Sequence, residues 1–193
     1  IIILTITFAF SQDPEALLSQ GETQLESGDY ESAETSFNSA LNFDPSFAPA
    51  LQALSKLFLH KGDLKKANEY SIQAVQADED FREWSNQISK ITEHIQNGTR
   101  NVQQALYDEA INEYDAISKV HPYFPDAEFY KGLTRFRQKD IESAARHFSN
   151  ALKIYPKHKK ARKGLDNVTK QFLNAGNKSY KRGDLGKATN YYQ

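Results

Sequence analysis

Residues 28–33 read GDYESA, and the same arrangement of glycine, aspartate and alanine returns at residues 62–67 (GDLKKA) and 183–188 (GDLGKA). The first two copies begin 34 residues apart. A repeat of this length is typical of a helical hairpin that cannot bury its apolar face alone and therefore stacks on its neighbours. The pattern predicts a chain of stacked helical hairpins, each of which turns at its Gly-Asp pair.

Other residue types recur in the same frame. When the glycine of each Gly-Asp pair is position 15 of a 34-residue unit, small residues fall where two helices would cross closely, and an aromatic residue falls beside them. The recurring residues are Gly21, Gly98, Gly132 and Gly176 at position 8; Ala33, Ala67, Ala110, Ala144 and Ala188 at position 20; Phe37, Tyr114, Phe148 and Tyr192 at position 24; and Pro45, Pro122 and Pro156 at position 32. Glycine lets the chain turn, aspartate caps the next helix, and proline ends the second helix. We therefore interpret these residues as structural.

This combination of positions resembles the tetratricopeptide repeat (TPR) family, over nearly all of residues 14–193. The resemblance implies an all-α fold, a right-handed superhelical solenoid of about five helix-turn-helix repeats. The repeats would occupy residues 14–47, 48–81, 82–124, 125–158 and 159–193. The third and fifth contain nine or ten additional residues, and we expect these residues, 82–90 and 159–168, to extend the first helix because neither stretch contains proline. For the first extension the alternative is a loop at Asn97-Gly98-Thr99.

Two repeats depart from the pattern. The second has Ser55 and Ser71 where glycine and an aromatic residue are expected, and the third has Ala105 at the turn and Ile117 at position 27. We expect these two repeats to pack less typically than the others.

Residues 1–10 (IIILTITFAF) form an uncharged apolar run that is too short to span a membrane as a helix. Ala9 and Ser11 supply the small side chains that signal peptidase requires, so we interpret residues 1–11 as a signal peptide cleaved before Gln12. The protein would then be exported, periplasmic or secreted, with a bacterial source favoured, and not a lipoprotein because no cysteine follows Ser11. The alternative is a buried strand or a first helix. Because the sequence lacks an initial methionine and stops within a helical pattern, we interpret it as a fragment.

The first helices of a TPR solenoid form its concave face, so the resemblance makes positions 2, 5, 9, 12 and 13 of each repeat the candidate binding surface. The predicted groove residues are Glu22 and Glu26 in repeat 1, Lys56 in repeat 2, Phe129, Leu133, Phe136 and Arg137 in repeat 4, and Tyr180 and Lys181 in repeat 5. Those of repeats 4 and 5 would form an apolar floor with basic sides for an acidic, hydrophobic peptide. Alternatively, Phe129 and Phe136 are core residues that contact the neighbouring repeat. The Lys, Asn and Arg pattern with which TPR co-chaperones hold a C-terminal carboxylate is absent, which disfavours a cytosolic heat-shock co-chaperone.

The charges are distributed unevenly along the chain. Residues 1–47 contain eight acids and no Lys or Arg, residues 48–124 contain eleven acids and eight bases, and residues 125–193 contain six acids and sixteen bases. These opposite charges favour salt-dependent head-to-tail self-association, the alternative being solvated helix faces without a binding role. The densest basic run, residues 157–163 (KHKKARK), is a candidate contact for anionic envelope polymers or lipid headgroups. We do not expect nucleic acid as a partner, because no stacking aromatic residue is interleaved in this run.

Catalytic and cofactor-binding motifs are missing from the sequence. It has no cysteine, its five histidines fall in no metal-binding spacing, and it contains no P-loop or dinucleotide-binding motif. We therefore expect no catalysis, no metal and no cofactor. The predicted function is that of an exported scaffold that binds a protein or peptide segment in its concave groove. Two alternatives remain open: the N-terminal accessory or targeting arm of a larger envelope enzyme or wall-anchored assembly protein, and a luminal co-chaperone of the secretory pathway.

Overall fold

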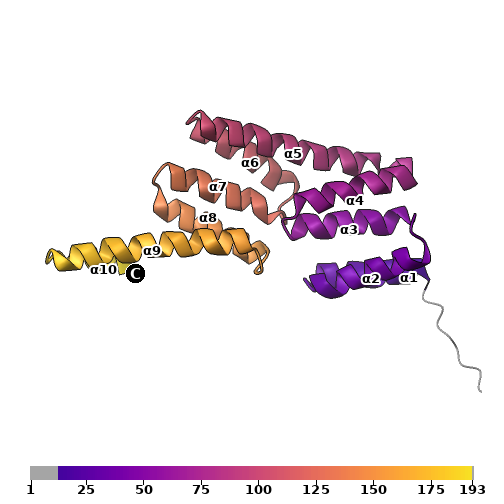
Figure 1. The fold of residues 1–193 in the computed structure, drawn as a ribbon, viewed down its shortest axis with the longest axis horizontal. Helices are drawn as coiled ribbons and strands as arrows, with labels where there is room; N and C mark the ends of the chain where they lie inside the picture. Colours follow the sequence, from indigo (N-terminus) through magenta and orange to yellow (C-terminus); the bar gives the residue numbers. More distant parts are fainter. Residues whose placement is uncertain (1–12, 193) are drawn as a thin grey trace, which may run out of the picture. The chain divides into compact units, whose positions relative to one another are not determined.

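The computed structural model describes residues 13–192, and within this range the chain forms ten α-helices, one short 3₁₀ helix and no strand (Figure 1). The α-helices are α1 (Pro14–Glu26), α2 (Tyr30–Phe43), α3 (Ala48–His60), α4 (Leu64–Ala77), α5 (Arg82–Gln103), α6 (Tyr107–Val120), α7 (Pro125–Arg137), α8 (Ile141–Ile154), α9 (Lys159–Lys181) and α10 (Leu185–Tyr192). Consecutive helices form five hairpins, each with an odd-numbered first helix. The all-α hairpin fold predicted from the sequence is confirmed, whereas the predicted signal peptide lies outside the described residues.

The first helices fall into two length classes. Helices α1, α3 and α7 have 13 residues each, whereas α5 has 22 and α9 has 23. Helix α5 is continuous through Asn97, Gly98 and Thr99, so no loop interrupts it there.

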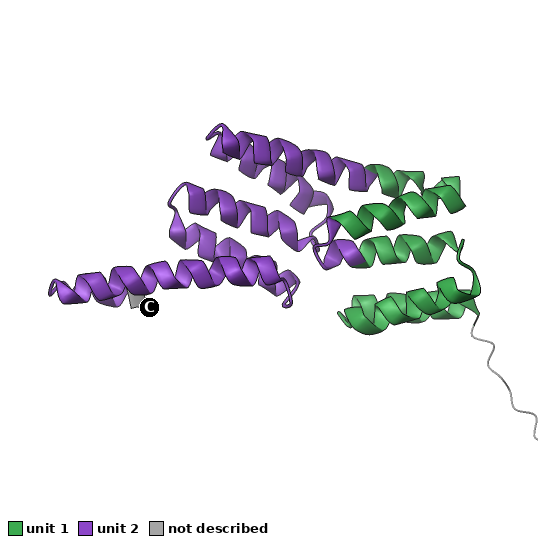
Figure 2. Cartoon of the chain, in the orientation of Figure 1, with its two compact units in different colours: residues 1–57, 65–86 green, residues 58–64, 87–193 purple. Residues whose placement is uncertain are grey.

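The helices are grouped in two compact units (Figure 2). Unit 1 contains the described residues up to Leu57 and residues 65–86, and unit 2 contains residues 58–64 and 87–193. The turn between α3 and α4 therefore belongs to unit 2. There, a Cβ atom on Gly62 would lie only 3.0 Å from Nε2 of His158, so the turn is packed closely against the start of α9.

Each hairpin turns at a residue with a left-handed backbone. The residues and their φ angles are Gly28 (80°), Gly62 (73°), Ala105 (61°), Lys139 (67°) and Gly183 (78°). In every turn the next amide donates to a carbonyl five residues earlier, as from Asp29 to Gln24 at 2.9 Å, which satisfies a carbonyl at the end of the first helix. Ala105 keeps this geometry although a side chain in the left-handed region costs roughly 1 kcal/mol.

Aspartate side chains cap three of the second helices, as predicted, whereas α6 follows Leu106 and has no side-chain cap. Asp29 accepts from the Ser32 amide at 3.2 Å, Asp140 accepts from the Ser143 amide at 3.1 Å, and Asp184 accepts from the Lys187 amide at 3.1 Å. These bonds fix the first turns of α2, α8 and α10, because each satisfies an amide that has no partner within the helix.

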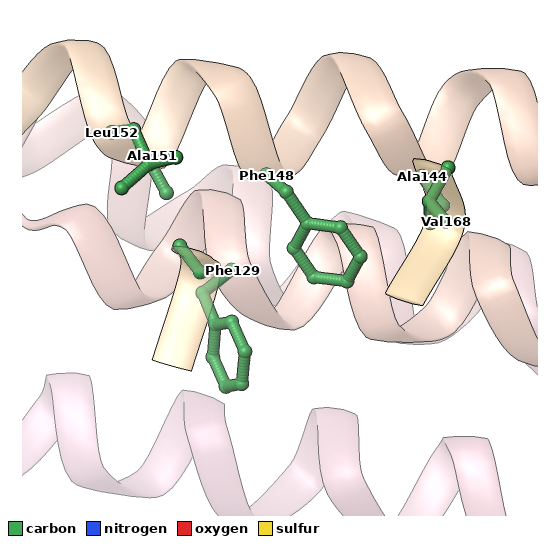
Figure 3. Packing of buried hydrophobic residues seen from close by; sticks show 7 residues of the cluster. Phe129, Ala144, Phe148, Ala151, Leu152 and Val168 are labelled. Carbon is green, nitrogen blue, oxygen red and sulfur yellow. The ribbon is translucent and has the colours of Figure 1, made fainter. Parts of the chain in front are cut away.

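The recurring glycine and aromatic residues interlock within a hairpin. A Cβ atom on Gly132 would lie 2.7 Å from ring carbons of Phe148, and a Cβ atom on Gly98 would lie 2.5 Å from the ring of Tyr114. Phe148 belongs to a buried cluster that joins α7, α8 and α9 (Figure 3). Its members are Phe129, Ala144, Phe148, Ala151, Leu152, Ala161 and Val168. Only a side chain without a Cβ atom leaves room for these rings.

In the second hairpin, hydroxyl groups replace the glycine and the aromatic ring. Ser55 donates to the Ala67 carbonyl at 2.6 Å and accepts from Nε1 of Trp84 at 2.8 Å. Ser71 donates to the Asn68 carbonyl at 2.8 Å. In this hairpin, hydrogen bonds stand where the other hairpins have packing between a glycine and a ring. Both buried hydroxyl groups have partners, so the departure from the repeat pattern leaves no unsatisfied polar group at these two positions.

An ionic cluster joins α6, α7 and α8 within unit 2. The Lys131 side chain, 7% exposed, forms ion pairs with Glu128 on its own helix and with Asp115 of α6, the latter at 2.9 Å. His147 of α8 donates from Nδ1 to the Glu128 carboxylate at 2.9 Å. Burial alone would raise the pKa of Glu128, but the hydrogen bonds and charges of His147 and Lys131 lower it to about 2.

The lowered pKa of Glu128 predicts a pH dependence of stability. Its contribution is present above the ordinary glutamate pKa of 4.5 and is lost as the pH falls toward 2. Glu128→Gln should therefore lower the free energy of unfolding at pH 7 by roughly 2 to 3 kcal/mol and make it less dependent on pH below about pH 5. Urea unfolding followed by circular dichroism at several pH values measures both effects. Glu142→Gln, in an exposed pair with Arg146, is the control and should change stability by less than about 0.5 kcal/mol. Equal pH slopes for wild type and Glu128→Gln would contradict the prediction.

Candidate functional site

The structure distributes the predicted groove residues over both units. Phe129, Leu133, Phe136 and Arg137 lie together on α7, and Tyr180 and Lys181 lie at the end of α9, all in unit 2. Glu22, Glu26 and Lys56 belong to unit 1, the first two on α1 and the third on α3. Each unit therefore has its own set of predicted groove residues.

Phe129 lies in the core rather than on a groove surface. It is 9% exposed and belongs to the cluster around Phe148. Its ring lies 5.6 Å from that of His158, and Nζ of Lys160 lies 5.9 Å from its centroid. His158 and Lys160 stand at the beginning of α9, so the start of this long helix covers Phe129. Phe136 is half-buried against the same cluster.

The long first helix α5 covers a predicted groove residue in the same way. Its Trp84 ring lies 5.7 Å from Nζ of Lys56, and its indole donates to the neighbouring Ser55. Lys56 is therefore half-buried against an aromatic face instead of projecting freely. The frame of 34 residues could not show this, because the contact depends on which residue stands at the start of the next hairpin, and Trp84 and His158 have no counterpart of the same type in the other repeats.

Four of the predicted groove residues in unit 2 remain accessible, and Leu173 of α9 is exposed as well. The exposed fractions are 37% for Leu133, 48% for Leu173 and 63% for Tyr180, and Arg137 and Lys181 are exposed beside them. We call these five residues the candidate face. Helices α7 and α9, which carry them, are in contact. The candidate face combines apolar side chains that gain from burial with cations that attract carboxylates.

A basic depression of about 420 Å³ lies at the start of α9. Its lining is Pro156, Lys157, His158, Lys159, Arg162, Lys163 and Asp166. His158 is buried there: Nδ1 accepts from the Ala161 amide at 3.0 Å, and Nε2 donates to Asp126 at 2.7 Å. Because both ring nitrogens are engaged, His158 is a helix cap and not a free ligand. The sequence indicated the basic run but not this capping role.

Within residues 13–192, no group of three or more histidine, aspartate or glutamate side chains is arranged to hold a metal ion. In the same range, no helix combines the length and the apolar character needed to cross a membrane.

Comparison with known proteins gives matches along most of the chain. Family models for the tetratricopeptide repeat match residues 14–47, 48–81 and 96–159. A search of curated proteins found no match. Similar solved structures include YrrB, a TPR protein with an unusual peptide-binding site, at 18% identity over 80% of this chain and 93% of that chain, with a TM-score of 0.38. MamA matches at 18% identity over 89% and 90% of the two chains with a TM-score of 0.36, and pilF of Pseudomonas aeruginosa at 20% identity over 92% and 88% with a TM-score of 0.33.

The positions of Phe129 and Leu133 predict truncation effects of different size. Phe129→Ala should lower the free energy of unfolding by about 3 kcal/mol or more, because it leaves a cavity in the cluster around Phe148. Leu133→Ala should lower it by less than about 1 kcal/mol, because its side chain is partly solvated already. Urea unfolding of both variants measures the difference. A small effect of Phe129→Ala would show that α9 does not cover this ring in solution.

Proposed function

Because the chain belongs to the tetratricopeptide repeat family, we propose that it is a scaffold that binds a segment of a partner protein. Stacked helical hairpins offer extended surfaces built from successive first helices, and such surfaces suit peptide segments better than small substrates. The function is binding without turnover.

The single observation that carries this function is the candidate face on α7 and α9. Leu133, Leu173 and Tyr180 leave much of their apolar surface in water, beside the cations Arg137 and Lys181. Burial of these side chains by a partner would release that surface from water, and tyrosine and arginine are frequent anchors of protein interfaces. The partner segment would therefore combine apolar residues with aspartate or glutamate.

Peptide selection tests this function directly. A random peptide library displayed on phage and selected on the purified chain should be enriched in apolar sequences that contain aspartate or glutamate. The variant Leu133→Ser, Leu173→Ser, Tyr180→Ser should bind the selected peptides at least about tenfold more weakly, as measured by fluorescence anisotropy.

A matched control removes exposed apolar residues outside the candidate face. Phe43, Ile72 and Val120 are also exposed, so replacing these three with serine should leave peptide binding unchanged. If the control variant loses as much binding as the candidate-face variant, or if neither loses any, the candidate face is not the binding site.

We also propose that residues 1–11 direct export. The support is the apolar run IIILTITFAF, followed by small residues that fit signal peptidase. Expression in a bacterium with an initiating methionine and a short basic leader should yield a periplasmic product that begins at Gln12 by mass spectrometry. Ser11→Arg should block cleavage and leave the precursor. A cytoplasmic product that retains Ile1 would refute this proposal without affecting the binding function.

A further inference from the structure

Three glutamates form an acidic stripe along α1. Glu15, Glu22 and Glu26 are all exposed, and their spacings of seven and four residues bring them to one face of the helix. At a rise of about 1.5 Å per residue the stripe is about 16 Å long. No Lys or Arg occurs anywhere in residues 13–47, so the α1 and α2 hairpin contains no cationic side chain that could neutralise it.

Three lysines form a basic stripe with the reverse spacing along α9. Lys159, Lys163 and Lys170 are exposed and lie four and seven residues apart. Read from its C-terminal end, this stripe has the same spacing as the acidic one. Two helices that run antiparallel would therefore place each glutamate opposite a lysine. The pairs would be Glu15 with Lys170, Glu22 with Lys163, and Glu26 with Lys159.

The residues between the charges are also compatible with this register. Asp166 of α9 lies between Lys163 and Lys170 and would face Ser19 of α1, whose hydroxyl can donate to a carboxylate. Arg162 would face Thr23. No like charges are placed opposite one another along the two stripes.

Each helix end that would take part carries the wrong charge for its own dipole. Helix α9 begins with Lys159 and Lys160 and has no acid in its first turn, although a helix N-terminus favours negative charge. Helix α1 ends at Glu26 and has no base in its last turn, although a helix C-terminus favours positive charge. Antiparallel contact brings these two ends together, so each receives the charge that its dipole favours.

We propose that α1 of one copy of this chain docks antiparallel on the N-terminal half of α9 of a second copy. Glu22 and Glu26 would then lie at the basic depression lined by Lys159, Arg162 and Lys163. The two surfaces are different, so a docked pair of copies still has one free α1 and one free α9, and association continues head to tail into rings or open chains. This docking shares no residue with the candidate face and does not depend on the peptide-binding function.

Sedimentation velocity of the purified chain at low and high salt tests the docking. At about 50 mM NaCl the chain should form concentration-dependent oligomers, and at about 500 mM NaCl the apparent dissociation constant should rise at least about tenfold because the pairs are exposed. A monomer at every salt concentration would overturn the proposal. The triple variant Leu133→Ser, Leu173→Ser, Tyr180→Ser should associate like wild type, and its failure to do so would also overturn it.

Charge reversal identifies the surfaces. Glu15→Lys, Glu22→Lys, Glu26→Lys should abolish association, as should Lys159→Glu, Lys163→Glu, Lys170→Glu, and circular dichroism should show that both variants remain helical. Mixing the two variants, or combining all six changes in one chain, should restore oligomers. The control Lys90→Glu, Lys119→Glu, Lys139→Glu changes the net charge by as much as the triple lysine variant of α9 does, but at exposed residues outside both stripes. This control should associate like wild type.

The rescue decides the outcome even if one variant folds poorly. Glu→Gln changes at the three α1 positions provide a milder test, since they should weaken association without adding charge. Association by either triple charge-reversal variant alone, or failure of the helical sixfold variant to associate, would refute the pairing of α1 with α9.

Discussion

A left-handed residue at the turn between two helices constrains every hairpin of this protein. Its amide and the next one close the first helix, and the second helix then starts at a fixed register. A shift of the turn by one residue would rotate the second helix by about 100° relative to the first and would move Phe148 away from Gly132. That penalty explains why Ala105 and Lys139 adopt a conformation that usually requires glycine: the packing that depends on the register outweighs the local strain.

The hairpins could be predicted because their determinants lie close together in the sequence. Gly132 and Phe148, for example, lie on two helices joined by one short turn, and the same separation in sequence recurs between the glycine and the aromatic residue of other repeats. The recurrence therefore reports an actual contact. The aspartate of the turn likewise indicated where second helices begin, since it is the capping residue in α2, α8 and α10, although in α8 it follows Lys139 and not a glycine.

The contacts between one hairpin and the next could not be predicted in this way. Trp84 donates to Ser55 across 29 residues, and Phe129 lies against His158 at the same separation, and neither pair of residue types recurs at the equivalent positions of the other repeats. Polar replacements were hidden for the same reason. Glu128 on α7 pairs with His147 on α8, and in the preceding hairpin His94 pairs with Glu113 at the same two positions of the repeat. The residue types are exchanged between the two hairpins, so neither position has a recurring residue type that would reveal the pair. Among the described residues no buried side-chain nitrogen or oxygen lacks a partner, so every buried polar side chain that stands where the repeat would have an apolar residue is hydrogen-bonded.

The starts of α5 and α9 have a consequence for how such proteins can change. A groove position is normally altered by replacing its own residue, but Lys56 lies against Trp84 and Phe129 lies against Lys160, and both neighbours stand in the first turn of the next hairpin's first helix. A substitution at the start of one hairpin thus covers or uncovers a recognition position of the hairpin before it and leaves the residue at that position intact. For the same reason the hairpins are not interchangeable modules, because a transplanted hairpin meets a different residue at the start of the helix that follows it. The accessibility of a surface position is in this sense inherited separately from the identity of its residue.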